Sequence, residues 1–188
     1  MRHNEVPEIP LEITTERLII RAPRQGDGAA LFEAIKASMH ELKPWMPWAH
    51  DGLTAETVED EAKRAQTRFM AREDLRYHIF LGESDTLIGG TGLHRIDWQI
   101  PQFEIGYWID SRHTGNGYAG EAAAGLENLA FNGLGARRVE IVCDSLNARS
   151  IAIPKRLGFQ FSGEKPTMFI PEGSKESTRT LLLFFKER

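Results

Sequence analysis

The strongest constraint on the fold of this chain is a strand, a glycine-rich turn and a helix that follow one another between residues 103 and 133. Apolar and polar residues alternate over 103–109, which is typical of a strand with one buried face. That face comprises Phe103, Ile105, Tyr107 and Ile109. Residues 112–120 hold three glycines and open a helix with alanines along one stripe. Because such a turn brings backbone N–H groups together beside the positive end of a helix, the unit predicts an anion site.

Further strands and helices flank this unit in an order that is not a regular alternation. Asp27 and Thr54 are predicted to cap two helices upstream, and another helix runs from about Asn147 to near Gly158. The other predicted strands span 17–21, 77–81, 87–93, 139–143, 159–162 and 180–185. We therefore expect an α+β (mixed α/β) fold, with about seven strands in a mixed sheet and about four flanking helices. It forms one domain over residues 1–188, with residues 1–14 as an N-terminal lead.

The composition excludes several functional classes. The formal net charge of −4 provides no basic field, so we expect no nucleic-acid partner. No apolar run approaches the roughly 18 residues of a membrane span, and the start of the sequence has no apolar signal stretch, so we expect no membrane association. The single cysteine, Cys143, alternates with Val139 and Ile141, which predicts a buried core thiol. It also favours a reducing compartment, and we expect a soluble, cytoplasmic protein.

The glycine-rich turn has more than one interpretation. Gly115, Gly117 and Gly120 have the G-x-G-x-x-G spacing of a dinucleotide-binding turn, and Glu140 follows at the expected distance. A dinucleotide unit, however, normally opens a domain of repeated strand–helix–strand elements, whereas about four predicted strands precede this one. The order favours another pyrophosphate ligand, with Arg112 as a candidate for a bidentate phosphate contact. A turn that only packs the helix on the sheet is the remaining alternative.

Four further segments stand in a fixed order with this turn. At the start of the last helix, Asn147 and Ser150 offer an amide and a hydroxyl to one cleft. The full set is Thr15-Glu16-Arg17-Leu18 with Arg21, Leu42-Lys43-Pro44-Trp45-Met46-Pro47-Trp48, Glu104-Ile105-Gly106-Tyr107-Trp108-Ile109, Arg112-x-x-Gly115-x-Gly117-x-Ala119, and Asn147-x-x-Ser150 ahead of Leu157-Gly158-Phe159. Together these segments cover nearly the whole chain. The chain resembles the GCN5-related N-acetyltransferase (GNAT) superfamily, in particular the RimJ/RimL type of ribosomal-protein N-terminal acetyltransferase.

The resemblance implies acetyl-coenzyme A as the donor substrate and a twisted, mostly antiparallel sheet with a V-shaped splay between two parallel strands. It implies that backbone amides of the turn hold the pyrophosphate, that the preceding strand pairs with the pantetheine arm, that Asn147 bonds this arm and that Ser150 lies near the thiol. The candidate donor-binding residues are Tyr107, Trp108, Ile109, Arg112, His113, Thr114, Gly115, Asn116, Gly117, Tyr118, Ala119, Asn147 and Ser150. Pro154 removes the N–H that would bond the Ser150 carbonyl, so we expect the helix to kink or tighten there.

Acetyl transfer from a thioester requires a neutral amine and a proton for the leaving thiolate. At pH 7 roughly one chain-terminal amine in ten is neutral, against roughly one lysine side chain in a few thousand, so an N-terminal acceptor demands less of a base. Glu104 is the candidate base, directly or through water, and a solvated or salt-bridged carboxylate is its alternative. Ser150 is the candidate acid, with backbone capping as its alternative and Tyr118 as a second candidate. A backbone N–H near Trp108 or Ile109 is the candidate oxyanion donor.

Trp45 and Trp48, set among prolines that exclude a regular helix, are the candidate acceptor-binding residues, with packing of a loop on the core as the alternative. His78, His94 and His113 have no paired metal-ligand spacing, so we expect no metal.

The sequence thus predicts an N-acetyltransferase that passes acetyl from acetyl-coenzyme A directly to a primary amine in a ternary complex, the acceptor being a protein N-terminal α-amine of the ribosomal-protein type. Two alternatives stay open: acetylation of a small amine, such as a polyamine or an aminoglycoside-like molecule, and a module that binds coenzyme A without turnover. A nicotinamide-dependent dehydrogenase ranks last. The resemblance also allows a homodimer that closes the acceptor cleft.

Overall fold

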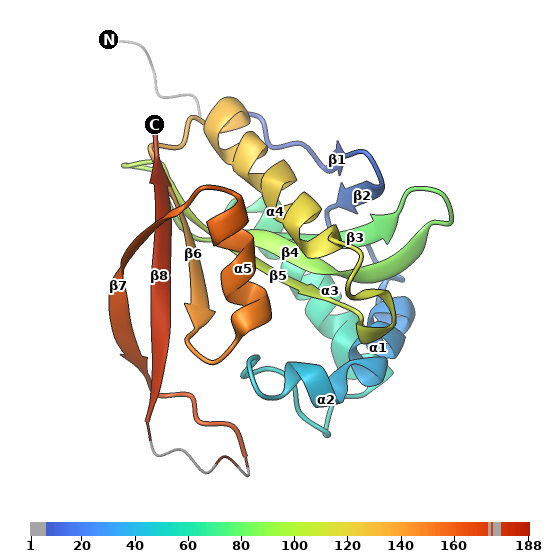
Figure 1. Ribbon diagram of the computed structural model, residues 1–188. Helices are drawn as coiled ribbons and strands as arrows, with labels where there is room; N and C mark the ends of the chain where they lie inside the picture. Colours follow the sequence, from blue (N-terminus) through green and yellow to red (C-terminus); the bar gives the residue numbers. More distant parts are fainter. Residues whose placement is uncertain (1–6, 173, 175–177) are drawn as a thin grey trace.

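The computed structural model describes residues 7–172, 174 and 178–188, which form a single sheet flanked by helices (Figure 1). Its strands are β1 (Glu12–Thr14), β2 (Leu18–Arg21), β3 (Leu75–Leu81), β4 (Thr86–Asp97), β5 (Gln102–Ile109), β6 (Arg138–Asp144), β7 (Gln160–Thr167) and β8 (Arg179–Glu187). They lie in the order β1-β2-β3-β4-β5-β6-β8-β7. Every neighbouring pair is antiparallel except β5 with β6, which confirms the predicted mixed, mostly antiparallel sheet, with eight described strands in place of about seven.

The additional strand, β1, lies within the segment 1–14 that the sequence suggested was only a lead. Glu12 pairs with Arg21 of β2, and the hydroxyl of Tyr77 donates a hydrogen bond to the carbonyl of Pro10 at 2.9 Å. A three-residue strand has too few alternating positions to be predicted from its own pattern. It forms because β2 offers it an edge. Residues 1–6 of the predicted lead lie outside the described part of the chain.

Five α-helices are described: α1 (Gly28–Ala37), α2 (Met39–Leu42), α3 (Ala55–Met70), α4 (Tyr118–Asn128) and α5 (Ala148–Arg156). Helix α4 crosses one face of the sheet, and α3 lies on the opposite face (Figure 1). Thr54 caps α3 as predicted, because its hydroxyl accepts from the N–H of Thr57 and Thr57 bonds back to complete a capping box. Asp27 stands at the predicted N-cap of α1, but its side chain makes no capping bond because it is engaged elsewhere.

The main core lies between the sheet and α4. It is built from alternate strand residues such as Ile20, Ile79 and Ile105 and from Leu126 of α4, all nearly inaccessible to solvent. Burial of one such side chain contributes roughly 1.5–3 kcal/mol. Cys143 belongs to this core as predicted, and burial raises the pKa of its thiol, which disfavours the reactive thiolate.

The feature of the sheet that matters most for a ligand is the junction of β5 and β6. These parallel strands pair only from Gln102 opposite Arg138 to Glu104 opposite Glu140. Residues 105–109 of β5 still pair with β4 on their other side, so on the β6 side they keep an unpaired edge of N–H and C=O groups. This is the V-shaped splay that the resemblance implied, and the glycine-rich turn begins where this edge ends.

Candidate active site

The glycine-rich turn joins β5 to α4 with a backbone suited to an anion. Gly115 and Gly117 have φ angles of +85° and +82°, the left-handed region that glycine adopts without steric cost. Gly117 is the N-cap of α4 and makes no side-chain capping bond. The first N–H groups of this 11-residue helix are therefore free for a ligand at its positive end.

Two arginines from distant segments flank this helix start. A cavity of about 380 Å³ beside the turn is lined by Arg17, from the loop before β2, and by Arg156, from the end of α5. Arg17 is bonded to Glu121 at 2.7 Å, and its guanidinium lies 4.7 Å from the centre of the Tyr118 ring. Neither arginine was predicted to have a role, although both lie in or beside the segments that carry the family resemblance, and that position was the available signal.

The side chains of the turn itself mostly hold the turn together. The guanidinium of Arg112, predicted to contact a phosphate, bonds the buried carboxylate of Asp110 through Nε at 3.0 Å and Nη2 at 2.5 Å. The amide of Asn116 donates to the carbonyls of His113 at 3.1 Å and Thr114 at 3.3 Å. The Arg112 guanidinium, predicted to bind a phosphate, thus binds a carboxylate of the protein. The groups of the turn that remain available to a ligand in the cavity are mainly those of the backbone.

Three predicted residues meet where α5 begins. The side-chain oxygen of Asn147 accepts from the N–H of Ser150 at 3.0 Å and so caps the helix. The hydroxyl of Ser150 lies 3.3 Å from the hydroxyl oxygen of Tyr107 and 3.2 Å from Sγ of Cys143. Three residues that the sequence assigned separately to the donor site therefore lie together, and the roles assigned to them stay predictions.

Tyr107 also explains how α5 accommodates Pro154. The tyrosine hydroxyl donates to the carbonyl of Ser150 at 3.1 Å, and this is the carbonyl that Pro154 deprives of its helical partner. The helix continues to Arg156 with that carbonyl satisfied. Burial raises the pKa of Tyr107 far above its usual range, so the hydroxyl keeps its proton and the donation persists at neutral pH.

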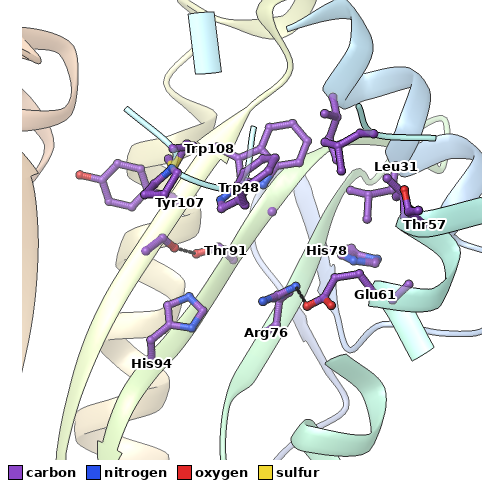
Figure 2. A pocket seen from close by; sticks show the side chains of 18 residues that line it. Leu31, Trp48, Thr57, Glu61, Arg76, His78, Thr91, His94, Tyr107 and Trp108 are labelled. Atoms are coloured by element: carbon purple, nitrogen blue, oxygen red, sulfur yellow. Dashed lines mark hydrogen bonds and ion pairs between the residues drawn. The ribbon is translucent and has the colours of Figure 1, made fainter. Parts of the chain in front are cut away.

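A second cavity, of about 470 Å³, lies on the face of the sheet that α1 and α3 cover (Figure 2). Its wall is mostly apolar and includes Leu31, Ile35, Met46, Pro47, Trp48, Leu53, Val58, Ala62 and Trp108. The rings of Trp48 and Trp108 pack with their centroids 5.9 Å apart. Trp45, the other predicted acceptor residue, does not line the cavity, and its ring packs against the guanidinium of Arg179 at 5.0 Å.

One end of this cavity is polar and comprises Glu61, Arg76, His78 and His94 (Figure 2). Glu61 accepts from Arg76 at 3.1 Å and from Arg68 at 2.5 Å, and Nδ1 of His94 is bonded to Asp74. These side chains come from α3, from the start of β3 and from β4. These residues were not predicted as a site, because only helix packing and strand pairing bring them together and no local motif marks them.

The buried carboxylate of Asp27 contacts this polar end through His78. It accepts from Arg21 at 2.7 and 2.9 Å and from the N–H of Arg24 at 2.8 Å, and Nδ1 of His78 lies 2.9 Å away. Burial opposes ionisation, but the bonds from His78 and Arg21 hold the pKa of Asp27 well below its usual range. His78, which lines the cavity, is therefore backed by an ionised carboxylate at neutral pH.

Glu104, the predicted base, lies directly opposite His94 on the β4–β5 pair. Its carboxylate is 3.0 Å from the guanidinium of Arg95 and is 18% exposed. Burial raises the pKa of Glu104 despite the nearby cation. Both readings that the sequence left open, a base and a salt-bridged carboxylate, agree with this placement.

The described ranges 7–172, 174 and 178–188 offer no cluster of metal ligands and no membrane-spanning helix. They contain no group of three or more histidine, cysteine, aspartate or glutamate side chains placed to hold a metal ion. They also contain no helix long and apolar enough to cross a membrane.

Comparisons with known proteins point to one family. Residues 17–160 match the family described as Acetyltransferase (GNAT) domain. The chain is 31% identical over 150 residues to the putative ribosomal N-acetyltransferase YdaF of Bacillus subtilis (strain 168), covering 79% of this chain and 81% of that protein. It is 35% identical over 88 residues to the uncharacterized N-acetyltransferase p20 of Bacillus licheniformis, and this match spans 47% of the chain and 49% of the relative, about half of each.

Among solved structures, the fold is similar to that of RimL, a ribosomal L7/L12 alpha-N-protein acetyltransferase in complex with coenzyme A. The TM-score is 0.85 at 19% identity, over 94% of this chain and 97% of the RimL chain.

Proposed function

Because the chain belongs to the GNAT family of acetyltransferases, we propose that it transfers the acetyl group of acetyl-coenzyme A to the α-amine of a protein N-terminus in a ternary complex. One observation carries the proposal: the unpaired edge of β5 lies between the glycine-rich turn on one side and the apolar cavity on the other. A donor held at the turn and an acceptor held in the cavity would meet at this edge.

The residues on the donor side fit acetyl-coenzyme A. A diphosphate suits the uncapped first turn of α4, and the two flanking arginines, Arg17 and Arg156, add positive charge. The pantetheine arm contains peptide-like amides, which an unpaired strand edge can bond as an additional strand does. The amide oxygen of Asn147 is already used by Ser150, so its NH₂ group is the part left for the arm. This assigns donor binding to the predicted segment Tyr107 to Ala119 and to Asn147.

The residues on the acceptor side favour a peptide over a polycation. Glu61 is the only carboxylate among the residues that line the cavity, and it is already bonded by Arg64, Arg68 and Arg76. A polyamine or an aminoglycoside needs several free carboxylates, whereas the wall formed by Trp48 and Trp108 suits a single apolar side chain. The names of YdaF and RimL support a ribosomal-protein N-terminus, and an acceptor of that kind places the protein in the cytoplasm.

The leaving thiolate needs a proton, and Ser150 is the proposed donor. Its hydroxyl is held by Tyr107 beside the unpaired edge of β5. For protonation of the thiolate, the sequence and the geometry both favour Ser150. For the amine, the sequence nominates Glu104.

The test is release of free thiol from acetyl-coenzyme A in the presence of acceptor panels. Peptides that begin with serine, alanine or methionine, each with a free and with a blocked N-terminus, are compared with spermidine and an aminoglycoside. We expect release only with free peptide N-termini. Faster release with spermidine or the aminoglycoside would favour the small-amine alternative. Tight binding of acetyl-coenzyme A with no release across both panels would indicate a binding module.

A further inference from the structure

We propose that His94, oriented by Asp74, takes the proton from the acceptor amine. The inference rests on the proposed function and deepens it, because it names the group that prepares the amine for attack. His94 lies in the wall of the apolar cavity, on the strand next to β5 (Figure 2).

The imidazole of His94 lies against two glycines that face each other across the β4–β5 pair, Gly92 and Gly106. A methyl group added at Gly92 would come within 2.7 Å of Nε2, and one added at Gly106 within 3.2 Å. Any larger residue at Gly92 would therefore displace the ring, and one at Gly106 would crowd it. The two glycines hold Nε2 of His94 over the backbone of β5.

Asp74 determines which nitrogen of the ring is available. Its carboxylate is bonded to Nδ1 of His94 and lies 3.8 Å from the guanidinium of Arg76. Burial opposes ionisation of Asp74, but the bond from His94 and the charge of Arg76 hold its pKa below the usual range. An ionised carboxylate accepts from Nδ1–H, so the lone pair of the neutral ring resides on Nε2. Asp74 is thus a positioning residue.

A β-bulge follows His94, which lies directly opposite Glu104 on β5. The β4–β5 register is irregular between His94 and Asp97, and Arg95 has a φ of +49°, the left-handed region. Bulges near active sites re-aim side chains, and here the bulge brings the guanidinium of Arg95 to the carboxylate of Glu104. Glu104 therefore has a cation as its partner, whereas His94 faces the cavity.

Nε2 of His94 lies near the part of β5 where donor and acceptor are proposed to meet. Gly106 lies two residues beyond Glu104, the last residue of β5 that pairs with β6, so it lies where the unpaired edge opens. Gly106 and His94 both line the cavity that would admit the acceptor. The side chain of His94 is 30% exposed, which leaves it a route for returning a proton to water.

The step balances without another reactant. Nε2 takes one proton from the ammonium group, and the freed lone pair of the nitrogen forms the N–C bond with the thioester carbonyl. The C–S bond breaks, and the second proton of the nitrogen reaches the thiolate through the Ser150 hydroxyl or a water. The imidazolium then gives its proton to solvent. The sum is an amide, a thiol and one released proton.

The charge that develops on the imidazole is surrounded by groups of both signs. Those on the packed elements are Asp74 and Arg76 at the start of β3, Arg95 on β4, Glu104 on β5, and Glu61 and Arg68 on α3, with Lys165 of β7 near Glu104. Among the residues that the structure describes, only Asp74 bonds the ring, so its carboxylate is the one that stabilises the imidazolium directly.

The test compares wild type, His94→Gln, His94→Ala and Asp74→Asn with acetyl-coenzyme A and a peptide that begins with a free serine, from pH 6 to 9.5. We expect His94→Gln to lower kcat roughly 100-fold at pH 7, since a general base contributes at least about that factor. Donor affinity should change less than threefold. The deficit should narrow at pH values above the roughly 7.7–8.0 pKa of the α-amine, where the amine is neutral without help. Asp74→Asn should lose about tenfold with a similar pH dependence.

Free imidazole provides the readout that a structural role would not produce. It should restore several-fold activity to His94→Ala, because only a missing proton acceptor is replaced by the free base. His40→Gln, at an exposed histidine of α2, is the matched control and should keep wild-type activity.

Failure of the proposed function and failure of this inference about His94 would give different results. If wild type releases no thiol with any free-amine peptide, the proposed function fails, and this inference with it. If wild type is active but His94→Gln retains its rate, or His94→Ala loses rate without rescue by imidazole, only the inference is overturned. A pH-dependent loss in Glu104→Gln that exceeds that of His94→Gln would assign the base to Glu104. Donor affinity and thermal melting of each variant exclude misfolding as the cause.

Discussion

The donor turn and the acceptor cavity are built in opposite ways. The turn is made of consecutive residues, 112–120, and what it presents to a ligand is mainly backbone, held open by two glycines at positive φ. The cavity is made of side chains from residues 31 to 108, and its polar end is held by buried and half-buried ion pairs. A binding site made of consecutive backbone groups can be predicted from the sequence, and a change in one dihedral angle is enough to disrupt it. A site assembled from distant side chains has no local sequence signal, and the loss of one charge is enough to disrupt it.

The largest effect is expected from Asp27→Asn, which removes a charge from the side chains behind the cavity. The substitution keeps the shape of the side chain but leaves the nearly buried guanidinium of Arg21 without its counter-ion. Removal of one partner from a buried pair costs on the order of 3–5 kcal/mol. We expect a loss of that size in the free energy of unfolding, measured by urea denaturation at pH 7. Asp60→Asn is the control, because Asp60 and Lys63 form an exposed pair that contributes less than about 1 kcal/mol.

Acid pH should remove the difference between wild type and Asp27→Asn. The folded-state pKa of Asp27 is depressed, so its contribution is present above the usual value of 3.8 and is lost as pH falls through the lower folded-state value. The gap between the two proteins should therefore be constant from pH 7 to about 5 and narrow below that. A gap that does not change with pH would show that the charge of Asp27 is not what stabilises the folded protein at this site.

The second substitution tests the glycine-rich turn alone. Gly117→Val places a β-branched residue at φ +82°, where it is strained, and directs its side chain toward the guanidinium of Arg17. Displacing the turn removes at least two charge-assisted hydrogen bonds of about 1.5 kcal/mol each, so affinity for acetyl-coenzyme A should fall about 100-fold in a calorimetric titration.

Gly135→Val is the matched control for the turn. Gly135 has a φ of +70° and open space around its Cα, and it lies at the far end of the helical segment that Gly117 begins. The same backbone penalty should lower stability there and leave donor affinity within threefold. Equal losses of affinity in both variants would mean that backbone strain, and not the position of the turn, weakens binding.

The same contrast explains what could be predicted. Alternation and helical spacing located every long element, and the glycine spacing located the turn, because these signals lie within a few neighbouring residues. Two features escaped because each depends on partners elsewhere in the chain: β1 needs the edge of β2, and the polar end of the cavity needs α3 beside β3 and β4. A third, the pairing of Arg112 with Asp110, joins residues only two positions apart but depends on how the turn folds. Pro154 is the clearest case. It signals a missing hydrogen bond to the carbonyl of Ser150, but nothing in the sequence shows that Tyr107, 43 residues before Ser150, restores it.

The smallest effect is expected from Ser150→Ala, which tests where the two regions meet. The N–H of Ser150 would still bond Asn147, and its carbonyl would still accept from Tyr107, so the start of α5 should persist without the hydroxyl. We expect turnover to fall about tenfold while donor affinity changes less than threefold, since the lost interaction serves the leaving thiolate and not the bound ground state. Steady-state rates and calorimetric affinity separate the two quantities. An equal fall in both would make Ser150 part of the donor site, and the transfer would then need its acid from elsewhere, with the buried hydroxyl of Tyr107 as the nearest proton.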